Sequence, residues 1–182
     1  MSTAACLGID TDGARDHRSG TMKIIDNDLF RTLCERADAD SRRRAHHLLH
    51  ASHDEPVQRM LIAIQPGTYF RPHRHSDPPK WELMLVLKGA AAWLGFDDSG
   101  TLTARHEAGA HRGAKGLEYP EGVWHALVCL AADTVLFECK QGPFAPTQPQ
   151  DFAPWSPAED DPRAGDAVRW MLRAQPGEKF EV

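Results

Sequence analysis

The feature that most constrains the fold is a series of short apolar or alternating runs between Val57 and Phe144. They recur roughly every 8–12 residues and are separated by turn sequences rich in Gly, Pro and Asp. The runs are VQRMLIAIQ, TYFRPHRH, ELMLVLK, AAWLGFD, TLTARHE, GLEYP, WHALVCLA and TVLFECK. Many short strands at this spacing are typical of an antiparallel sandwich or barrel, and DDSG predicts a hairpin. We therefore expect an all-β barrel over residues 56–144.

The flanking segments differ from this pattern. Residues 1–22 are polar and aperiodic, which predicts a flexible N-terminal arm. Residues 23–55 combine a charged approach segment with a short helix, for which Asn27 is the expected N-cap. An apolar stripe at helical spacing supports that helix: Leu29, Phe30, Leu33, Cys34 and Ala37. Residues 145–182 predict a Pro-rich surface strap, anchored by Phe152 and Trp155, and then a short C-terminal helix.

Composition excludes several classes of partner. A formal charge of −5 and a pI near 6.0 provide no basic surface for nucleic acid or an anionic membrane. No apolar run approaches the roughly 20 residues that span a bilayer, and the first residues lack the apolar region of a secretory signal. The cysteines form no CxxC pair, so we expect reduced thiols in a cytoplasmic protein: Cys6, Cys34, Cys129 and Cys139. The alternative is a disulfide between Cys129 and Cys139, which we expect on neighbouring strands.

Three of the ten histidines stand at spacings that suit a metal. On an extended strand His73 and His75 point the same way, Glu82 begins the next run, and His125 follows the PEG turn. Three imidazoles and a carboxylate suit one divalent transition metal such as Fe, Mn, Ni, Co or Zn, with positions left for water and substrate. For HxH alone, a pair of half-buried strand histidines is the simpler reading. The ordered set favours the metal.

These spacings resemble the two motifs of the cupin superfamily. Gly67, His73, His75, Glu82 and Gly89 match the first motif, although six residues, more than usual, separate His75 from Glu82. Pro120, Gly122 and His125 match the second, and Cys129 stands where Asn is usual. The resemblance implies a single cupin double-stranded β-helix, a jelly-roll barrel, with the metal ligands His73, His75, Glu82 and His125. It also implies a homodimer.

Residues 23–160 further resemble the WbuC family of cupin-fold metalloproteins. That family takes its name from surface-polysaccharide gene clusters, which implies a role with a carbohydrate derivative by association only.

Strand parity predicts further residues of the pocket. Tyr69 and Arg71 share the expected face of His73 and His75. Tyr69 is a candidate for proton transfer, as is Glu82 if it is not a ligand. Arg71 is a candidate for holding a substrate carboxylate or phosphate, or else a surface arginine. In the long loop, Lys80 and Trp81 are candidates for substrate binding, with Trp81 alternatively capping the barrel end.

Several other polar residues have a less specific signal. Arg42, Arg43 and Arg44 predict either a solvated face or an arm laid over the pocket. No second metal site is expected among the nearby histidines, which are His46, His47, His50 and His53. Cys129 is expected to be a small core residue, and Glu138, if buried, needs a partner.

Two classes of function follow. The first is a metal-dependent enzyme acting on a small polar molecule, by isomerase or lyase chemistry or, with iron, as a dioxygenase. The second is a non-enzymatic small-molecule-binding cupin. The sugar-epimerase cupins work without a metal, so an intact ligand set argues against that branch.

Overall fold

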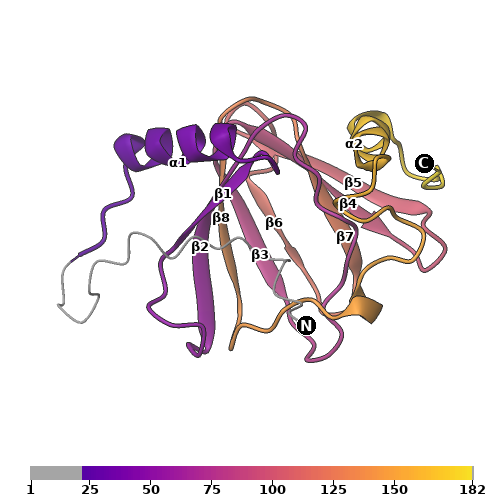
Figure 1. The fold of residues 1–182 in the computed structure, drawn as a ribbon, viewed down its shortest axis with the longest axis horizontal. Coiled ribbons are helices and arrows are strands. Elements are labelled where there is room, and N and C mark those ends of the chain that lie inside the picture. The colour runs from indigo at the N-terminus through magenta and orange to yellow at the C-terminus, as the bar shows by residue number, and fades with distance from the viewer. Residues whose placement is uncertain (1–21, 182) are drawn as a thin grey trace.

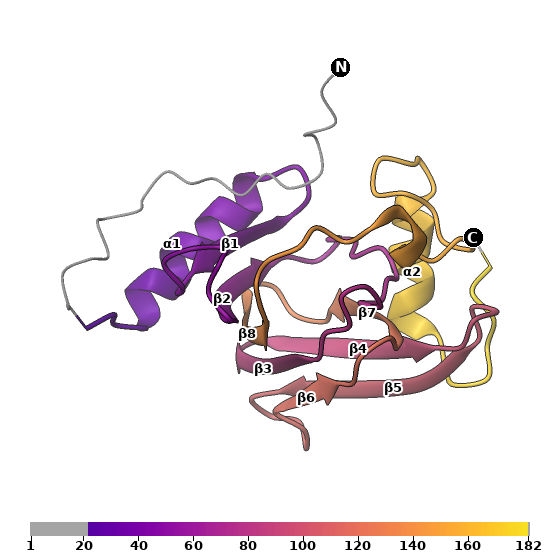
Figure 2. The same cartoon turned by 90° about the horizontal axis from the view of Figure 1, so that it is seen from below.

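Two antiparallel sheets face each other and carry a helix on each outer side (Figures 1 and 2). The computed structural model describes residues 22–181. Residues 1–21 of the expected arm, with Cys6, lie outside the described residues, as does Val182. The five-stranded sheet has the order β1 (Arg44–Leu48), β2 (Val57–Ile64), β8 (Thr134–Gln141), β3 (Glu82–Lys88), β6 (Gly116–Tyr119). The three-stranded sheet has the order β5 (Leu102–Gly109), β4 (Ala90–Phe96), β7 (Trp124–Cys129).

The core lies between the two sheets because side chains alternate faces along each strand. Met60, Ile62 and Ile64 of β2 point inward and pack with Trp93 of β4. Leu61, on the opposite parity, points outward toward α1 (Asn27–Ala39). The arrangement is the all-β jelly roll expected from the sequence, with the predicted short N-terminal helix.

The helices cover the outer faces of the two sheets (Figure 1). α1 buries Leu33, Cys34 and Ala37 of its predicted stripe against the five-stranded sheet. α2 (Ala164–Arg173) packs Val168, Trp170 and Met171 on the three-stranded sheet, and Trp155 of the Pro-rich strap joins the same cluster. Between them the strap contains the short turn η1 (Pro149–Asp151). None of the described helices is long and apolar enough to cross a membrane.

Some local expectations are wrong. The run TYFRPHRH forms no regular strand and pairs only through isolated bridges, because Pro72 has no backbone N–H to donate. A strand that was not expected, β1, forms within the charged approach segment. The N-cap of α1 is Asp26 rather than Asn27, and its side chain accepts a hydrogen bond from the Leu29 N–H.

The described cysteines carry free thiols. Cys129 lies on β7 and Cys139 on β8, and these strands belong to different sheets. The expectation of neighbouring strands was therefore wrong, whereas that of reduced thiols is confirmed for Cys34, Cys129 and Cys139. Cys129 is a buried core residue, as expected.

Candidate metal centre

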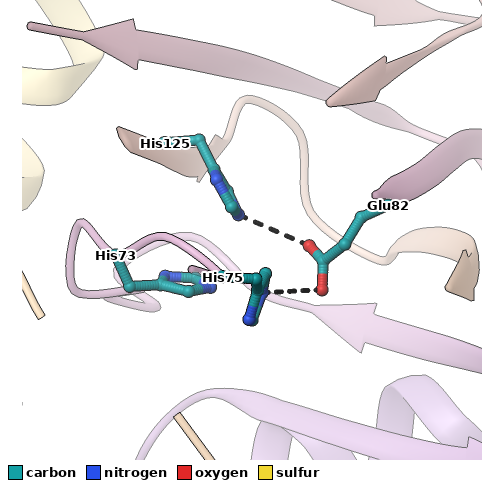
Figure 3. A group of neighbouring side chains, drawn as sticks. All are labelled: His73, His75, Glu82 and His125. Atoms are coloured by element: carbon teal, nitrogen blue, oxygen red, sulfur yellow. Dashed lines mark ion pairs between the residues drawn. The ribbon is translucent and has the colours of Figure 1, made fainter. Parts of the chain in front are cut away.

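The four predicted ligands come together at one point (Figure 3). His73, His75, Glu82 and His125 each offer a ligand atom, and these atoms all lie within 4.8 Å of one another. Nε2 of His75 is 2.9 Å from Oε1 of Glu82, and Nε2 of His125 is 3.4 Å from Oε2. The three imidazoles face the carboxylate from one side, and no other such cluster occurs among residues 22–181.

Backbone hydrogen bonds hold the irregular ligand segment in place of a strand ladder. His73 and His125 exchange both backbone bonds, with N···O distances of 3.0 and 2.8 Å. The Gly122 N–H donates to the carbonyl of His75 at 3.1 Å, which ties the two motif loops together. On the other side the strap supplies Asp151, whose carbonyl accepts from the Arg74 N–H and whose buried carboxylate accepts from the Ser76 hydroxyl.

The backbone explains why two positions of the motifs are occupied by glycine. Gly89 ends β3 with a φ of +78°, and a Cβ there would lie 2.3 Å from Oγ1 of Thr134. Gly122 has a φ of +72° in the turn that leads into His125. Only glycine adopts such a backbone without strain. The two glycines of the motifs therefore mark sharp turns, one after the strand of Glu82 and one before His125.

The imidazole tautomers point Nε2 at the centre. Nδ1 of His73 lies 2.9 Å from the carbonyl of Arg71, and Nδ1 of His125 lies 2.9 Å from that of Val123. Because a carbonyl only accepts, each Nδ1 carries the proton and each Nε2 presents a lone pair. Burial, with His125 and His75 beside it, lowers the pKa of His73 well below its ordinary value, which favours the neutral ligand form.

The electrostatics fit a bound cation. Nε2 of His75 and of His125 are buried without a hydrogen-bond partner, although both lie close to Glu82. The Nε2 lone pair of His125 faces a carboxylate oxygen that repels it, and buried polar atoms are normally paired. A divalent metal among the four side chains resolves both conflicts, so the residues present fit the group.

Lys140 holds Glu82 from the opposite side. Its ammonium donates to Oε1 of Glu82 at 2.9 Å and lies 2.8 Å from Oε1 of Glu138, which is the partner that Glu138 needed. Burial alone would raise the pKa of Glu82, but the neighbouring ammonium of Lys140 lowers it well below its ordinary value. Burial raises the pKa of Glu138. Lys140 thus forms ion pairs with two buried carboxylates.

The register places these residues in one polar row across the sheet. Gln58 on β2 is directly opposite Lys140 on β8, Lys140 is opposite Glu82 on β3, and Glu82 is opposite Tyr119 on β6. The Tyr119 ring stacks on His125 with 4.1 Å between centroids. Stacking on the ring and the bond to Val123 together fix the orientation of His125.

A cavity of about 160 Å³ opens beside the cluster and is lined by His73, Glu82 and His125. Much of the remaining lining is apolar: Leu48, Met60, Ile62, Phe70, Met84, Leu127 and Phe144. Met84 and Leu127 in this lining each stand two residues along a strand from a candidate ligand, Glu82 and His125. A cationic wall joins them, formed by Arg42, Arg44 and Lys140.

The predicted substrate residues lie outside this lining. The Tyr69 hydroxyl donates to the carbonyl of Pro157 at 3.0 Å, within the cluster beside α2. Arg71 donates to Ser156 and to the carbonyl of Ala153, with its guanidinium over Phe152. Strand parity fails here because the segment is not a strand, and Phe70 faces the cavity in their place.

The two loop candidates are also elsewhere. Lys80 is buried and donates to the carbonyl of Pro143, and Trp81 is half-buried without lining the cavity. The function proposed below assigns no role to either residue.

Sequence reasoning missed Lys140, Gln58 and Tyr119 as neighbours of the metal ligands. Lys140 stands two residues after Glu138 on one strand, so parity already placed both on one face. For the arginine run, Arg42 and Arg44 line the cavity, which supports the arm over the pocket, whereas Arg43 pairs with Asp38 on the surface. His46, His50 and His53 line the cavity as well, without forming a metal cluster among the described residues.

Comparisons with known proteins add little about function. The model of a domain of unknown function (DUF6016) matches residues 25–108, which include three of the four ligands but not His125. No curated protein matches.

Among solved structures, KdgF from Halomonas sp. is similar at 14% identity and a TM-score of 0.44, over 57% of this chain and 81% of that one. A mutant of oxalate decarboxylase from Bacillus subtilis is similar at 18% and 0.43, over 55% of this chain, which spans 24% of that one. A cupin superfamily protein from Desulfitobacterium hafniense is similar at 16% and 0.41, over 54% and 75%. At these identities and TM-scores they say nothing about what this chain binds. What the structure itself shows is an all-β jelly roll that carries, within residues 22–181, one cluster of three histidines and a glutamate.

Proposed function

We propose that the chain binds one divalent transition metal through His73, His75, Glu82 and His125 and holds a small polar molecule beside it. The observation that carries the proposal is the pair of buried Nε2 atoms, on His75 and His125, that lack a hydrogen-bond partner and face Glu82. The cavity that reaches three of the four ligands supports a site that a second molecule can enter.

The ligand set supports two reaction classes. A bound metal supplies Lewis-acid polarisation and a template that orients the substrate. The chain's own residues provide the rest: Lys140 and the backbone bonds fix the ligands, and the apolar lining excludes water. An isomerase or lyase, or with iron a dioxygenase, uses such a site, and a non-enzymatic binding cupin is the alternative. The WbuC resemblance adds a carbohydrate derivative as the proposed molecule. The homodimer and the cytoplasmic location stay predictions.

Metal content of protein purified without a His-tag tests the proposal. After exposure to Fe, Mn, Ni, Co and Zn, we expect the wild type to retain about one ion per chain. The double variant His73→Ala/His125→Ala is expected to retain none. The matched control is His106→Ala/His111→Ala, which removes two exposed histidines and is expected to keep the ion. Equal uptake by the two double variants, or no retained ion in the wild type, rejects the metal centre.

Oxygen consumption separates the reaction classes. Uptake of oxygen by the iron-loaded protein with a substrate favours the dioxygenase. A turnover without oxygen favours an isomerase or lyase, and binding without turnover favours the non-enzymatic module.

A further inference from the structure

One cationic side chain of the cavity, Arg42, has only a long ion pair within residues 22–181. Of the cavity's three cationic side chains, Arg44 donates to both carboxylate oxygens of Glu159 at 2.7 Å, and Lys140 lies between Glu82 and Glu138. The third is Arg42, in the turn before β1. Its nearest carboxylate is Asp40, at 3.9 Å from Nε, and no residue of 22–181 accepts a hydrogen bond from its guanidinium. That fork of donors is therefore available to a ligand.

Charge balance decides what kind of ligand the cavity accepts. Without a metal, the three cations face four carboxylates, those of Asp40, Glu82, Glu138 and Glu159, so a divalent metal leaves one positive charge in excess. A divalent metal adds two positive charges to a cavity whose lining is mostly apolar, where charges are weakly screened. A neutral ligand leaves that excess in place, whereas an anion removes part or all of it.

We propose that the metal-loaded cavity binds a small carboxylate anion, with its carboxylate paired to Arg42 and its other end at the metal. The inference rests on the proposed function, because the metal supplies the excess charge. Arg42 precedes β1, at the edge of the sheet, while Glu82 lies on β3, three strands away on the same inner face. A ligand between them lies over Met60 and Ile62 of β2.

The size and the lining of the cavity limit which anions can bind in it. A cavity of about 160 Å³ is below the range of roughly 300–1,000 Å³ typical of sites for drug-sized molecules, so the anion has only a few carbons. A planar guanidinium matches a carboxylate through two parallel hydrogen bonds. The apolar side chains Leu48 and Phe70 favour a ligand with a hydrocarbon part over inorganic phosphate.

Titration of the Co²⁺-loaded protein, followed by its visible absorption, tests this. The probes are glycolate, malate, glycerol and inorganic phosphate. We expect at least one carboxylate to bind more tightly than glycerol and phosphate, and Arg42→Gln to weaken it about tenfold or more, the usual loss for a charged hydrogen bond. Arg42→Lys keeps the charge and loses the fork, so an intermediate loss is expected. The control is Arg43→Gln, next in sequence and outside the cavity, with an expected change below about twofold.

The outcomes separate the two proposals. If the wild type does not take up Co²⁺, the metal centre is rejected, and this inference with it. If Co²⁺ binds but glycerol or phosphate binds as tightly as the carboxylates, or Arg42→Gln behaves like Arg43→Gln with its Co²⁺ content unchanged, only the carboxylate inference is rejected.

Discussion

Replacing Lys140 by methionine removes the ammonium that lies between two buried carboxylates. Glu82 is 2% exposed and Glu138 is 4% exposed, so neither is solvated once the lysine is gone. Removing one partner of a buried ion pair costs about 3–5 kcal/mol. Protonation of Glu138 relieves part of this, so we expect about 3 kcal/mol for metal-free protein at pH 7.5. At about 2–4 °C per kcal/mol for a chain of this length, Tm falls by about 6–12 °C.

The stability lost in Lys140→Met is expected to increase with pH. In the variant the folded-state pKa of Glu138 lies above its unfolded value, so the folded state binds the extra proton. The destabilisation is therefore largest at high pH and shrinks as the pH falls through that folded-state pKa. Bound metal also reduces the destabilisation, because the positive ion compensates the charge of Glu82 in place of the lysine.

Urea unfolding at pH 7.5 and 5.5, with the metal removed by a chelator, measures the effect. Lys88→Met is the matched control, since Lys88 is 46% exposed and 3.8 Å from Asp133, and we expect it to cost less than about 0.5 kcal/mol. The double variant Lys140→Met/Glu138→Gln is expected to recover at least about 1.5 kcal/mol, because one uncompensated charge is gone. The reasoning fails if Lys140→Met costs no more than Lys88→Met, or if the double variant recovers nothing.

Two further predictions concern the cavity wall. Burial, with Arg44 close by, lowers the pKa of His46 to about 3, below its unfolded value, so its contribution to stability is lost as pH falls below about 6.5. Between pH 7 and 5 the free energy of unfolding of the wild type should fall by about 1–2 kcal/mol more than that of His46→Gln, and parallel urea curves would contradict this. Arg44→Met leaves the carbonyl of Tyr69 and the carboxylate of Glu159 without their donor, and we expect a loss of about 2 kcal/mol and faster proteolysis within residues 145–163. The exposed ion pair of Arg169 is the control, and a comparable loss in Arg169→Met would reject the role of Arg44.

The sequence predicted the ligands because their spacing reflects local geometry. His125 directly follows a glycine turn and Glu82 directly precedes a strand, so short-range rules place both. His73 and His75 converge even though their segment is no strand. Backbone bonds to His125 and to the strap replace the ladder, and the HxH spacing survives that replacement.

Tyr69 and Arg71 do not line the cavity, because the orientation expected for them depended on a regular strand. Alternation from Tyr69 to His75 assigned Tyr69 and Arg71 to the pocket, and the proline at position 72 ends that alternation. The cavity wall formed by β1 depends on pairing with β2, and the bond between Arg44 and Glu159 joins residues 115 positions apart. Neither contact leaves a local signal. Strand alternation alone could have placed Lys140 on the same face as Glu138. Its contact with Glu82 could not be predicted, because it depends on how β8 is aligned with β2 and β3.

That register has a consequence for how the chain folds. β8 pairs with β2 and β3 such that Lys140 meets Glu82, while Val135 and Phe137 meet the stripe of α1. A slip of one residue turns β8 over, and it would press the charges of Glu138 and Lys140 into that apolar layer without partners. Burying each such unpaired charge costs several kcal/mol, so misaligned pairings of β8 are much less stable than the native one. Glu138 and Lys140, which surround the candidate ligand Glu82, therefore also favour the correct strand alignment, and substitutions there are expected to increase misfolding.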